Sequence, residues 1–290
     1  MRNLKMIVEY DGSGYHGWQR QKNGLSIQQV LEEKIGVITG EKVTVIGSGR
    51  TDAGVHALAQ GAHFKTNCGI PAANLLKGIN SLLPADIVLK SLEEADEDYH
   101  ARIDAKGKIY LYQIFNSPTR TVLYRHYAWI VHCPLDLALM REAAGYLIGR
   151  HDFTSFSSVH TDVISFEREL RRIEIVSYQA TSGRAMNHPS ASSGEDDREK
   201  LQEARNEGGS GECDPAKLNY LQSEHPLIKI FVEADGFLRY MVRTIVGTLV
   251  EVGRGKRKPE DMAAILKGRD RKLAGMTAPP QGLFLKEVIY

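Results

Sequence analysis

The stretch GSGRTDAGVHALAQ, from Gly47 to Gln60, lies between two segments that have the composition of β-strands. KVTVIGS (42–48) precedes it, and AQGAHFKT (59–66) resumes a strand-like pattern. The residues between Ser48 and Ala59 are therefore predicted to form a loop that joins two neighbouring strands. Glycines in such a loop allow backbone angles and close approaches that a side chain would forbid.

These two strands belong to a longer order of elements in the first third of the chain. The expected strands are 4–10, 42–48, 59–66 and 86–94, and the expected helices are 26–38 and 72–83. The resulting order is strand, helix, strand, strand, helix, strand. That is the order of the split β-α-β unit found in ferredoxin-like folds.

A similar order recurs after residue 105, with additions. The expected strands are 108–116, 127–131, 170–178, 227–234 and 283–290, and the expected helices are 136–149, 237–253 and 259–268. Two such units predict an α+β fold with a mainly antiparallel sheet and helices on one face. The predicted domains are residues 1–104, which carry the glycine-rich loop, and residues 105–290.

The composition is that of a globular protein, but the charge is distributed unevenly. Of 290 residues, 42% are apolar and 25% are charged, and the net charge is +1. The segment 181–225 holds nine acids and five bases, so it carries −4 and the rest of the chain carries +5. This segment has little to bury, and we predict that it is a disordered acidic insertion. The basic clusters 168–172, 254–258 and 267–272 are either solvated faces or contacts for an anionic partner.

Several kinds of site and location are disfavoured. No apolar run approaches a membrane span, and the N-terminus lacks a signal-peptide pattern. Three widely spaced cysteines, Cys68, Cys133 and Cys213, suggest reduced thiols in a cytoplasm and no zinc site. The histidines and serines support neither a metal site nor a Ser-His-Asp triad.

Residues 12–17 fit the pattern G-x-G-x-x-G, which is typical of dinucleotide-binding folds. The chain continues as a loop, however, and the next helix begins only near Ser26. We therefore interpret these residues as a glycine-rich loop that presents Trp18, Gln19 and Arg20.

Asp52 is the candidate reactive group of the loop at 47–60. A carboxylate on a rigid loop at the edge of a sheet can act as a nucleophile or a base. It must be ionised, which an ordinary Asp with a pKa of about 3.9 is at neutral pH. When a substrate covers it, its pKa rises unless a cation lies close by. The residues alone leave a second interpretation open, in which Asp52 only stabilises a turn.

The chain resembles a known family along nearly its whole length. GRTDAGVHALAQ (49–60) is similar to the catalytic motif of tRNA pseudouridine synthases of the TruA type. The other matching motifs, in the family's order, are EYDGSGYHGWQRQ (9–21), INSLLPADI (79–87), YHAR (99–102), KIYLYQIFN (108–116), HDFTSF (151–156), GFLRYMVRTIVGTLVEVGRGK (236–256) and APPQGLFLKEVIY (278–290). The resemblance implies the pseudouridine synthase fold, in which two ferredoxin-like or RRM-like lobes share a mainly antiparallel sheet flanked by helices.

The resemblance also implies an activity and the residues that carry it. The family isomerises uridine to pseudouridine at positions 38, 39 and 40 of tRNA, on the 3′ side of the anticodon stem-loop, without a cofactor or a metal. Asp52 matches the nucleophile, Arg50 the arginine that assists base flipping, Tyr110 the tyrosine that stacks on the target base, and Arg243 the arginine that pairs with the carboxylate. Arg20 and Gln19, with Arg50 and Tyr110, are the expected substrate-binding residues. The family is usually homodimeric, and we expect a cytoplasmic enzyme.

Two other classes of function stay open at this point. A catalytically idle RNA-binding protein with paired RRM-like lobes is the first, although the strands lack the aromatic signature of such domains. A nucleoside or glycoside hydrolase that uses Asp52 is the second. Hydrolases of that kind usually need two carboxylates, and the loop supplies one.

Overall fold

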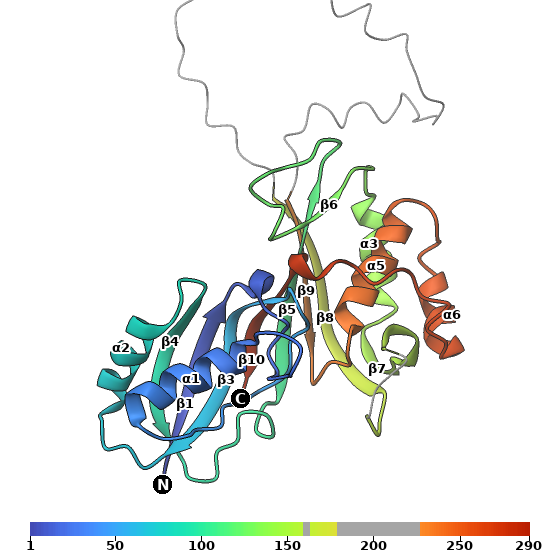
Figure 1. The fold of residues 1–290 in the computed structure, drawn as a ribbon. Helices are drawn as coiled ribbons and strands as arrows, with labels where there is room; N and C mark the ends of the chain where they lie inside the picture. The colour runs from blue at the N-terminus through green and yellow to red at the C-terminus, as the bar shows by residue number, and fades with distance from the viewer. Residues whose placement is uncertain (159–162, 179–226) are drawn as a thin grey trace, which may run out of the picture.

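The computed structural model describes residues 1–158, 163–178 and 227–290, whose strands form one sheet (Figure 1). The strand order is β4-β1-β3-β10-β5-β9-β8-β7, with β2 against β3 and β6 against β5. The strands are β1 (Arg2–Tyr10), β2 (Ile46–Gly47), β3 (His56–Thr66), β4 (Ile87–Ala95), β5 (Gly107–Asn116), β6 (Trp129–Val131), β7 (Gly149–Asp152), β8 (Glu167–Tyr178), β9 (Leu227–Ala234) and β10 (Leu283–Ile289). The helices are α1 (Ile27–Thr39), α2 (Ala72–Leu82), α3 (Leu137–Gly145), α5 (Met241–Gly253) and α6 (Asp261–Gly268), and short 3-10 turns are η1 (Gly12–Gly14), η2 (Thr154–Phe156) and η5 (Pro280–Gly282).

The first half has the predicted split β-α-β topology. Its strands lie in the order β4-β1-β3-β2, and each neighbouring pair is antiparallel. Helix α1 begins after Ser26, whose side chain accepts a hydrogen bond from the Gln29 amide at 3.3 Å. It ends at Gly40, whose φ of 71° is the left-handed conformation common after helices.

The second half repeats this topology, as its element order predicts. Strands β10, β5, β9 and β8 lie side by side in that order, and each neighbouring pair is antiparallel. Helix α3 separates β5 from β8 in sequence, and α5 separates β9 from β10, so each helix takes the place that α1 or α2 takes in the first half. The additions are β6, β7 and α6. The sheet is thus mostly antiparallel and flanked by helices, which confirms the predicted fold class.

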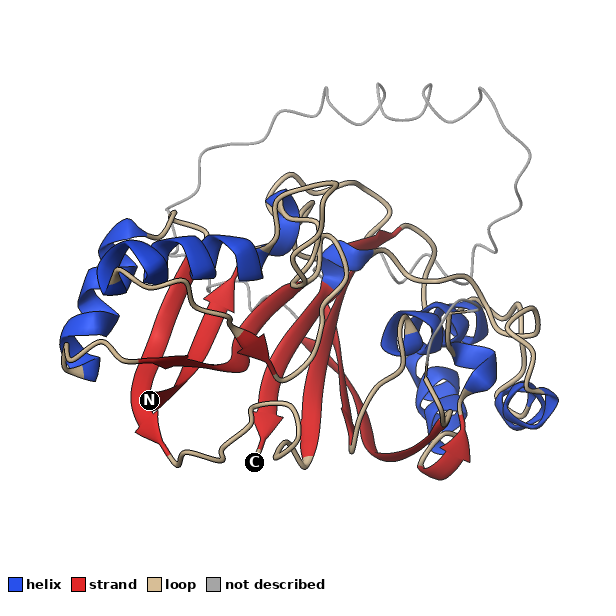
Figure 2. Ribbon diagram, turned by 60° about the horizontal axis from the view of Figure 1, so that its bottom comes forward, coloured by secondary structure: helices blue, strands red, loops and turns tan. Residues whose placement is uncertain are grey.

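The two halves join where β10 pairs with β3 in parallel, through Phe284 with His56 and Leu285 with Ala57. Figure 1 and Figure 2 show α1 and α2 at one end of the sheet and α3, α5 and α6 at the other. The last strand of the chain therefore lies in the middle of the sheet, between strands from different halves. Strand β5 is its neighbour on the other side.

Helix α5 is buried on nearly all sides, as its apolar sequence predicts. Within it, only Arg243 and Glu251 are partly exposed. The segment before β10 packs against it so closely that a Cβ added at Gly247 would lie 1.8 Å from the carbonyl oxygen of Met276. The Ala278 amide also donates a hydrogen bond to the Arg243 carbonyl at 3.0 Å. Helix α5 and the segment 276–279 thus form one packed unit beside β5.

Several boundaries differ from the prediction for identifiable reasons. Strand β2 has two residues instead of the seven in 42–48, because Val45 makes its backbone bonds with α1 side chains: its amide donates to Glu32 and its carbonyl accepts from Gln28. Helix α5 begins at Met241 instead of residue 237, because Tyr240 has a φ of 65°. Helix α3 ends at Gly145, and the unpredicted strand β7 follows.

Two predictions about organisation stay untested. Because the sheet is continuous, the division into domains 1–104 and 105–290 remains a prediction. The predicted acidic insertion at 181–225 lies outside the described residues. Among the helices of the described ranges, none combines the length and apolar character needed to cross a bilayer.

Candidate active site

The glycine-rich loop after β1 packs against the loop that carries Asp52 and supports it through backbone contacts. The Trp18 amide donates a hydrogen bond to the Thr51 carbonyl at 3.1 Å. Gly17, with a φ of 88°, lies against this segment, and a Cβ there would be 2.4 Å from the Thr51 oxygen. A Cβ at Gly12 would be 2.0 Å from the Val55 oxygen. The G-x-G-x-x-G residues thus serve close backbone contact between two loops.

Asp52 itself is only partly exposed and is paired with Arg243. The carboxylate is 25% exposed, and Arg243 Nη1 donates a hydrogen bond to Oδ2 at 3.2 Å. Burial raises the pKa of Asp52 above its ordinary value, and the charge and hydrogen bond of Arg243 oppose this rise. Arg243 is held in turn, because its Nε donates to the Ala278 carbonyl at 2.7 Å. The predicted pairing of Asp52 with Arg243 is therefore present in the structure.

Tyr110 lies in the middle of β5 near the same carboxylate. It is 8% exposed, and its ring meets that of Phe237 edge-on at a centroid distance of 5.0 Å. Burial, and secondarily the negative charge of Asp52, raises the pKa of the Tyr110 hydroxyl. Tyr112, on the same strand, donates its hydroxyl proton to the Pro279 carbonyl at 2.8 Å. Of these two tyrosines, Tyr112 is thus held by a structural hydrogen bond, whereas Tyr110 lies close enough to Asp52 for the charge of the carboxylate to act on its hydroxyl.

Three of the four expected substrate-binding residues, Arg50, Gln19 and Arg20, form a second group on the exposed side of the loop. Arg50 is exposed, and its Nε donates to Gln19 Oε1 at 3.0 Å. Gln19 donates to Gln28 of α1 at 2.7 Å, and Arg20 pairs with Glu32 of α1 at 3.1 Å. Within the described ranges, no hydrogen bond or ion pair joins Arg50 to Asp52. The structure therefore brings Arg50, Gln19 and Arg20 together, beside but not on the carboxylate.

Three residues near the carboxylate were not predicted from the sequence as site residues. Arg239 Nε lies 4.0 Å from Asp52 Oδ1, and Tyr240 and Phe237 contact the arginines and Tyr110, respectively. All three belong to GFLRYMVR, which was interpreted as the start of a helix. The available signal was an arginine and two aromatic residues at the edge of an otherwise apolar segment.

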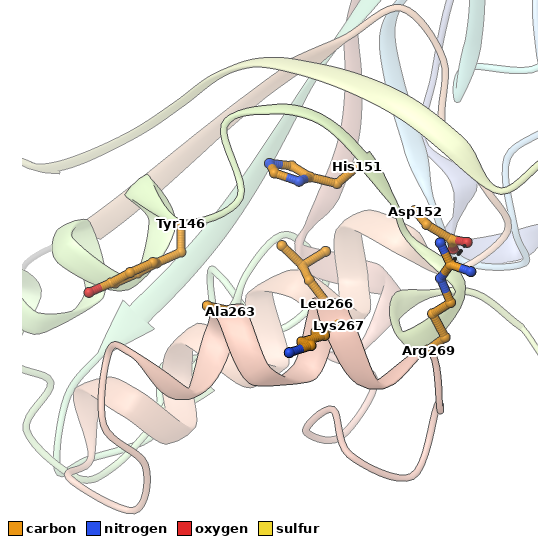
Figure 3. A pocket seen from close by; sticks show the side chains of 7 residues that line it. All are labelled: Tyr146, His151, Asp152, Ala263, Leu266, Lys267 and Arg269. Atoms are coloured by element: carbon orange, nitrogen blue, oxygen red, sulfur yellow. Dashed lines mark ion pairs between the residues drawn. The ribbon is translucent and has the colours of Figure 1, made fainter.

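A hollow in the second half lies away from this cluster. It has a volume of about 530 Å³ and lies between β7 and α6, with Tyr146, His151 and Lys267 among its lining residues (Figure 3). Arg269 and Asp152 form an ion pair at its edge, at 3.1 Å. None of the predicted site residues lines it. In the described ranges, no three His, Cys, Asp or Glu side chains are grouped as metal ligands would be.

The arrangement around Asp52 suits chemistry on an aromatic, uncharged group. A carboxylate held by an arginine can attack or take a proton, and the ring of Tyr110 offers a face or an edge to a planar base. The exposed Arg50 and the partly exposed Gln19 can contact a polyanion bound at the surface.

Comparison with known proteins agrees with this interpretation. The sequence profile of a family described as tRNA pseudouridine synthase matches residues 6–104 and 143–290. A protein of Acetivibrio thermocellus named tRNA pseudouridine synthase A is 42% identical over 290 residues, which is all of both chains. Proteins of Thermoanaerobacter sp. (tRNA pseudouridine synthase A) and Clostridium perfringens (tRNA pseudouridine synthase A 2) are 41% identical, again over all of both chains. With matches that cover both halves of the sheet and the loop of Asp52, the chain belongs to the tRNA pseudouridine synthase family.

Proposed function

We propose that this protein isomerises uridine to pseudouridine in tRNA and that Asp52 is the nucleophile. The observation that carries the proposal is the carboxylate itself: partly buried, mounted on a loop that a second loop supports, and paired with Arg243. Family membership and the names of the relatives support the reaction and the substrate class.

The reaction conserves all atoms of the nucleoside. The bond between C1′ and N1 breaks, the uracil turns while it is held, and a bond between C1′ and C5 forms. C5 loses its proton, and N1 gains one. Asp52 can assist by attack on the sugar, by attack on the uracil ring, or by promoting elimination to a glycal. In each route the carboxylate must be ionised, and the two nearby arginines favour the ionised form.

Tyr110 is proposed to stack on the extruded uracil. Stacking of a base on an aromatic side chain is worth roughly 1–3 kcal/mol. The hydroxyl has a raised pKa in the unliganded site, so it is protonated at neutral pH and cannot accept the C5 proton there. A proton-transfer role would require the hydroxyl to lose its own proton first, which burial and, secondarily, the charge on Asp52 both oppose.

Arg50, Gln19 and Arg20 are proposed to contact the RNA around the target nucleotide. A base inside a stem must leave the stack before it can reach a partly buried carboxylate. The exposed Arg50 side chain, steadied by Gln19, is suited to occupy the vacated space. The basic clusters 168–172, 254–258 and 267–272 would then contact phosphates and position the RNA without reading its sequence.

The finer assignment follows the family resemblance. We propose uridines of the anticodon stem-loop as targets, a homodimer as the active form and the cytoplasm as the location.

Tritium release from tRNA transcribed with C5-tritiated uridine tests the proposal. We expect release that is matched by pseudouridine in the recovered tRNA, with no free uracil. Binding of tRNA without tritium release would favour the idle RNA-binding protein, and free uracil would favour a hydrolase.

A further inference from the structure

Two arginines lie beside the carboxylate of Asp52, and they differ in exposure and in distance from it. Arg243 Nη1 contacts Oδ2 at 3.2 Å and is 13% exposed. Arg239 Nε lies 4.0 Å from Oδ1 and is 56% exposed. Each carboxylate oxygen thus has its own cation, one inside the protein and one at its surface.

The inner arginine is fixed by contacts that do not involve Asp52. Its Nε donates to the Ala278 carbonyl at 2.7 Å, and its backbone carbonyl accepts from the Ala278 amide. Because α5 and the segment around Ala278 are packed together, Arg243 cannot leave the carboxylate without a change in the core. It is a permanent partner of Oδ2.

The outer arginine has a fixed backbone and a loosely held side chain. Its carbonyl accepts a hydrogen bond from the Ser158 amide at 3.0 Å. Its guanidinium lies over the ring of Tyr240 at 4.9 Å and donates to the Tyr240 hydroxyl at 3.1 Å. Within the described part of the chain, Asp52 is the only carboxylate paired with it. An exposed ion pair at 4.0 Å is weak, so a stronger anion can displace it.

Tyr240 explains why the two arginines lie together. Its φ of 65° and ψ of 0° are left-handed, a conformation that a non-glycine residue adopts only when its surroundings enforce it. This turn places its ring within 4.9 Å of the Arg239 guanidinium and 5.2 Å of the Arg243 guanidinium. The ring therefore contacts both guanidinium groups, and that of Arg243 is also fixed by its hydrogen bond to the Ala278 carbonyl.

A phosphate group is the anion that this site would meet if the proposed function holds. Arginine binds phosphate through parallel hydrogen bonds, which are stronger than a single solvated contact to a carboxylate. A target nucleotide with its base near Tyr110 brings its own phosphates close to the mouth of the site. Arg239, which is 56% exposed and lies 4.0 Å from Asp52, is a cation within reach of them.

We propose that Arg239 is an exchangeable partner of Asp52, which it leaves when RNA binds in order to hold a phosphate at or next to the target nucleotide. This inference rests on the proposed function. The exchange frees Oδ1, whereas Arg243 keeps Oδ2 fixed. The carboxylate is then oriented by one arginine and has one oxygen open to the nucleoside. Arg239 is thus a positioning residue that couples RNA binding to exposure of the nucleophile.

The test compares Arg239→Gln, Arg239→Lys and the control Arg150→Gln. Arg150 is 60% exposed and pairs with Glu169 and Asp235. It lies on the edge strand β7, which β10, β5, β9 and β8 separate from β3, and it belongs to none of the basic clusters. Fluorescence anisotropy measures the affinity of each protein for a labelled tRNA transcript between low and high salt. Initial rates of tritium release give kcat and KM separately.

For Arg239→Gln we expect KM to rise about tenfold at moderate salt, with kcat within about threefold of the parent. The slope of log affinity against log salt should become shallower by the amount that corresponds to the loss of about one phosphate contact. Arg239→Lys should keep the slope, because it keeps the charge, and Arg150→Gln should change neither the slope nor the kinetic constants.

An unchanged salt slope in Arg239→Gln, or a fall in kcat with KM intact, would overturn the exchange. Thermal melting of each variant checks that the fold is kept. Absence of tritium release by the parent enzyme would contradict the proposed function instead, and the binding data would still report on the phosphate contact.

Discussion

The charge of Asp52 is balanced between two opposing effects. Burial raises its pKa, whereas Arg243 and, more weakly, Arg239 lower it. Tyr110 of β5 lies close enough for the charge of Asp52 to raise the pKa of its hydroxyl, in addition to the larger effect of burial. The net direction is upward, so the folded protein holds the charged form less favourably than the unfolded chain does. A reactive carboxylate that is not fully stabilised by its surroundings is more available for attack.

This balance predicts how Asp52→Asn affects stability. A carboxyl whose pKa is raised by folding contributes stability at low pH, and that contribution is lost as the pH rises through the folded-state value. At neutral pH the parent must keep the Asp52 carboxylate charged in a partly buried place, which lowers its stability. The variant removes this free-energy cost, so its melting temperature should equal that of the parent or exceed it by up to about 3 °C.

Thermal unfolding followed by circular dichroism at pH 7 and near pH 4 measures this. The difference in melting temperature should narrow at the lower pH, where a larger fraction of the Asp52 carboxyl of the parent is protonated. A variant that melts well below the parent at pH 7 would mean that the pairing with Arg243 outweighs burial.

Tyr110→Phe distinguishes the role of the Tyr110 ring from that of its hydroxyl. The variant keeps the edge contact with Phe237 and the surface for stacking, so tRNA affinity should stay within about threefold of the parent. If the hydroxyl transfers a proton after Asp52 has reacted, turnover should fall by about 10²–10⁴. Single-turnover pseudouridine formation measures this, and an unchanged rate would leave stacking as the role of Tyr110.

The glycine-rich loop made Asp52 a candidate, and the family resemblance identified its role and pointed to Tyr110 and Arg243. Sequence reasoning did not identify Arg239, because the position of its side chain depends on the left-handed turn at Tyr240. Nothing in GFLRYMVR marks that turn, since tyrosine does not favour this conformation. The missed residue therefore depends on tertiary contacts, which local patterns do not report.

At the scale of elements, the loop of Asp52 depends on a second loop for its shape. The turn after β1 touches it at two backbone oxygens, those of Thr51 and Val55, where no Cβ can fit. These loop contacts, together with the hydrogen bond at 2.8 Å between the hydroxyls of Tyr10 in β1 and Thr51, hold the carboxylate in place. Rigidity of this kind is what a site needs to orient a reacting group.

Gly12→Ala should disrupt this contact, and Gly14→Ala is the matched control. A Cβ at Gly12 would meet the Val55 oxygen at 2.0 Å, whereas nothing lies within 4 Å of one at Gly14 in the same turn. We expect Gly12→Ala to reduce kcat/KM at least tenfold and to lower stability by about 1–3 kcal/mol. Urea denaturation and tritium release measure both. Equal behaviour of the two variants would show that the close contact does not position Asp52.

Element boundaries were predictable wherever local signals mark them. Ser26 and Gly40 delimit α1, and alternating apolar residues mark β9. The prediction failed at 42–45, because Val43 and Val45 have strand composition although the backbone of Val45 bonds to the α1 side chains Gln28 and Glu32. In this segment the strand-like pattern thus indicates which side chains are buried, but not which groups form hydrogen bonds with the backbone.

At the scale of the whole molecule, two similar units share one sheet. The recurrence of their element order was visible in the sequence. The pairing of β3 with β10 could not be predicted from the sequence, since it consists of two residue pairs whose members lie more than two hundred positions apart. It brings the loop of Asp52, at the start of β3, close to β5 with Tyr110 and to α5 with Arg243. The site exists only because both units contribute to it.

The shared sheet predicts that both halves unfold together. Leu285 of β10 is fully buried at the junction, whereas its neighbour Lys286 is partly exposed. Leu285→Ala should cost about 2–5 kcal/mol and shift a single transition, and Lys286→Ala should change little. Denaturation followed by tryptophan fluorescence and circular dichroism measures this. Two separate transitions would support independent domains at 1–104 and 105–290.

The most direct measurement for the whole account is single-turnover pseudouridine formation by Asp52→Asn beside the parent enzyme, with tRNA affinity measured in parallel. The account predicts that the variant binds tRNA within about tenfold of the parent and forms no detectable pseudouridine. Pseudouridine formation by the variant at a measurable fraction of the parent rate would contradict it.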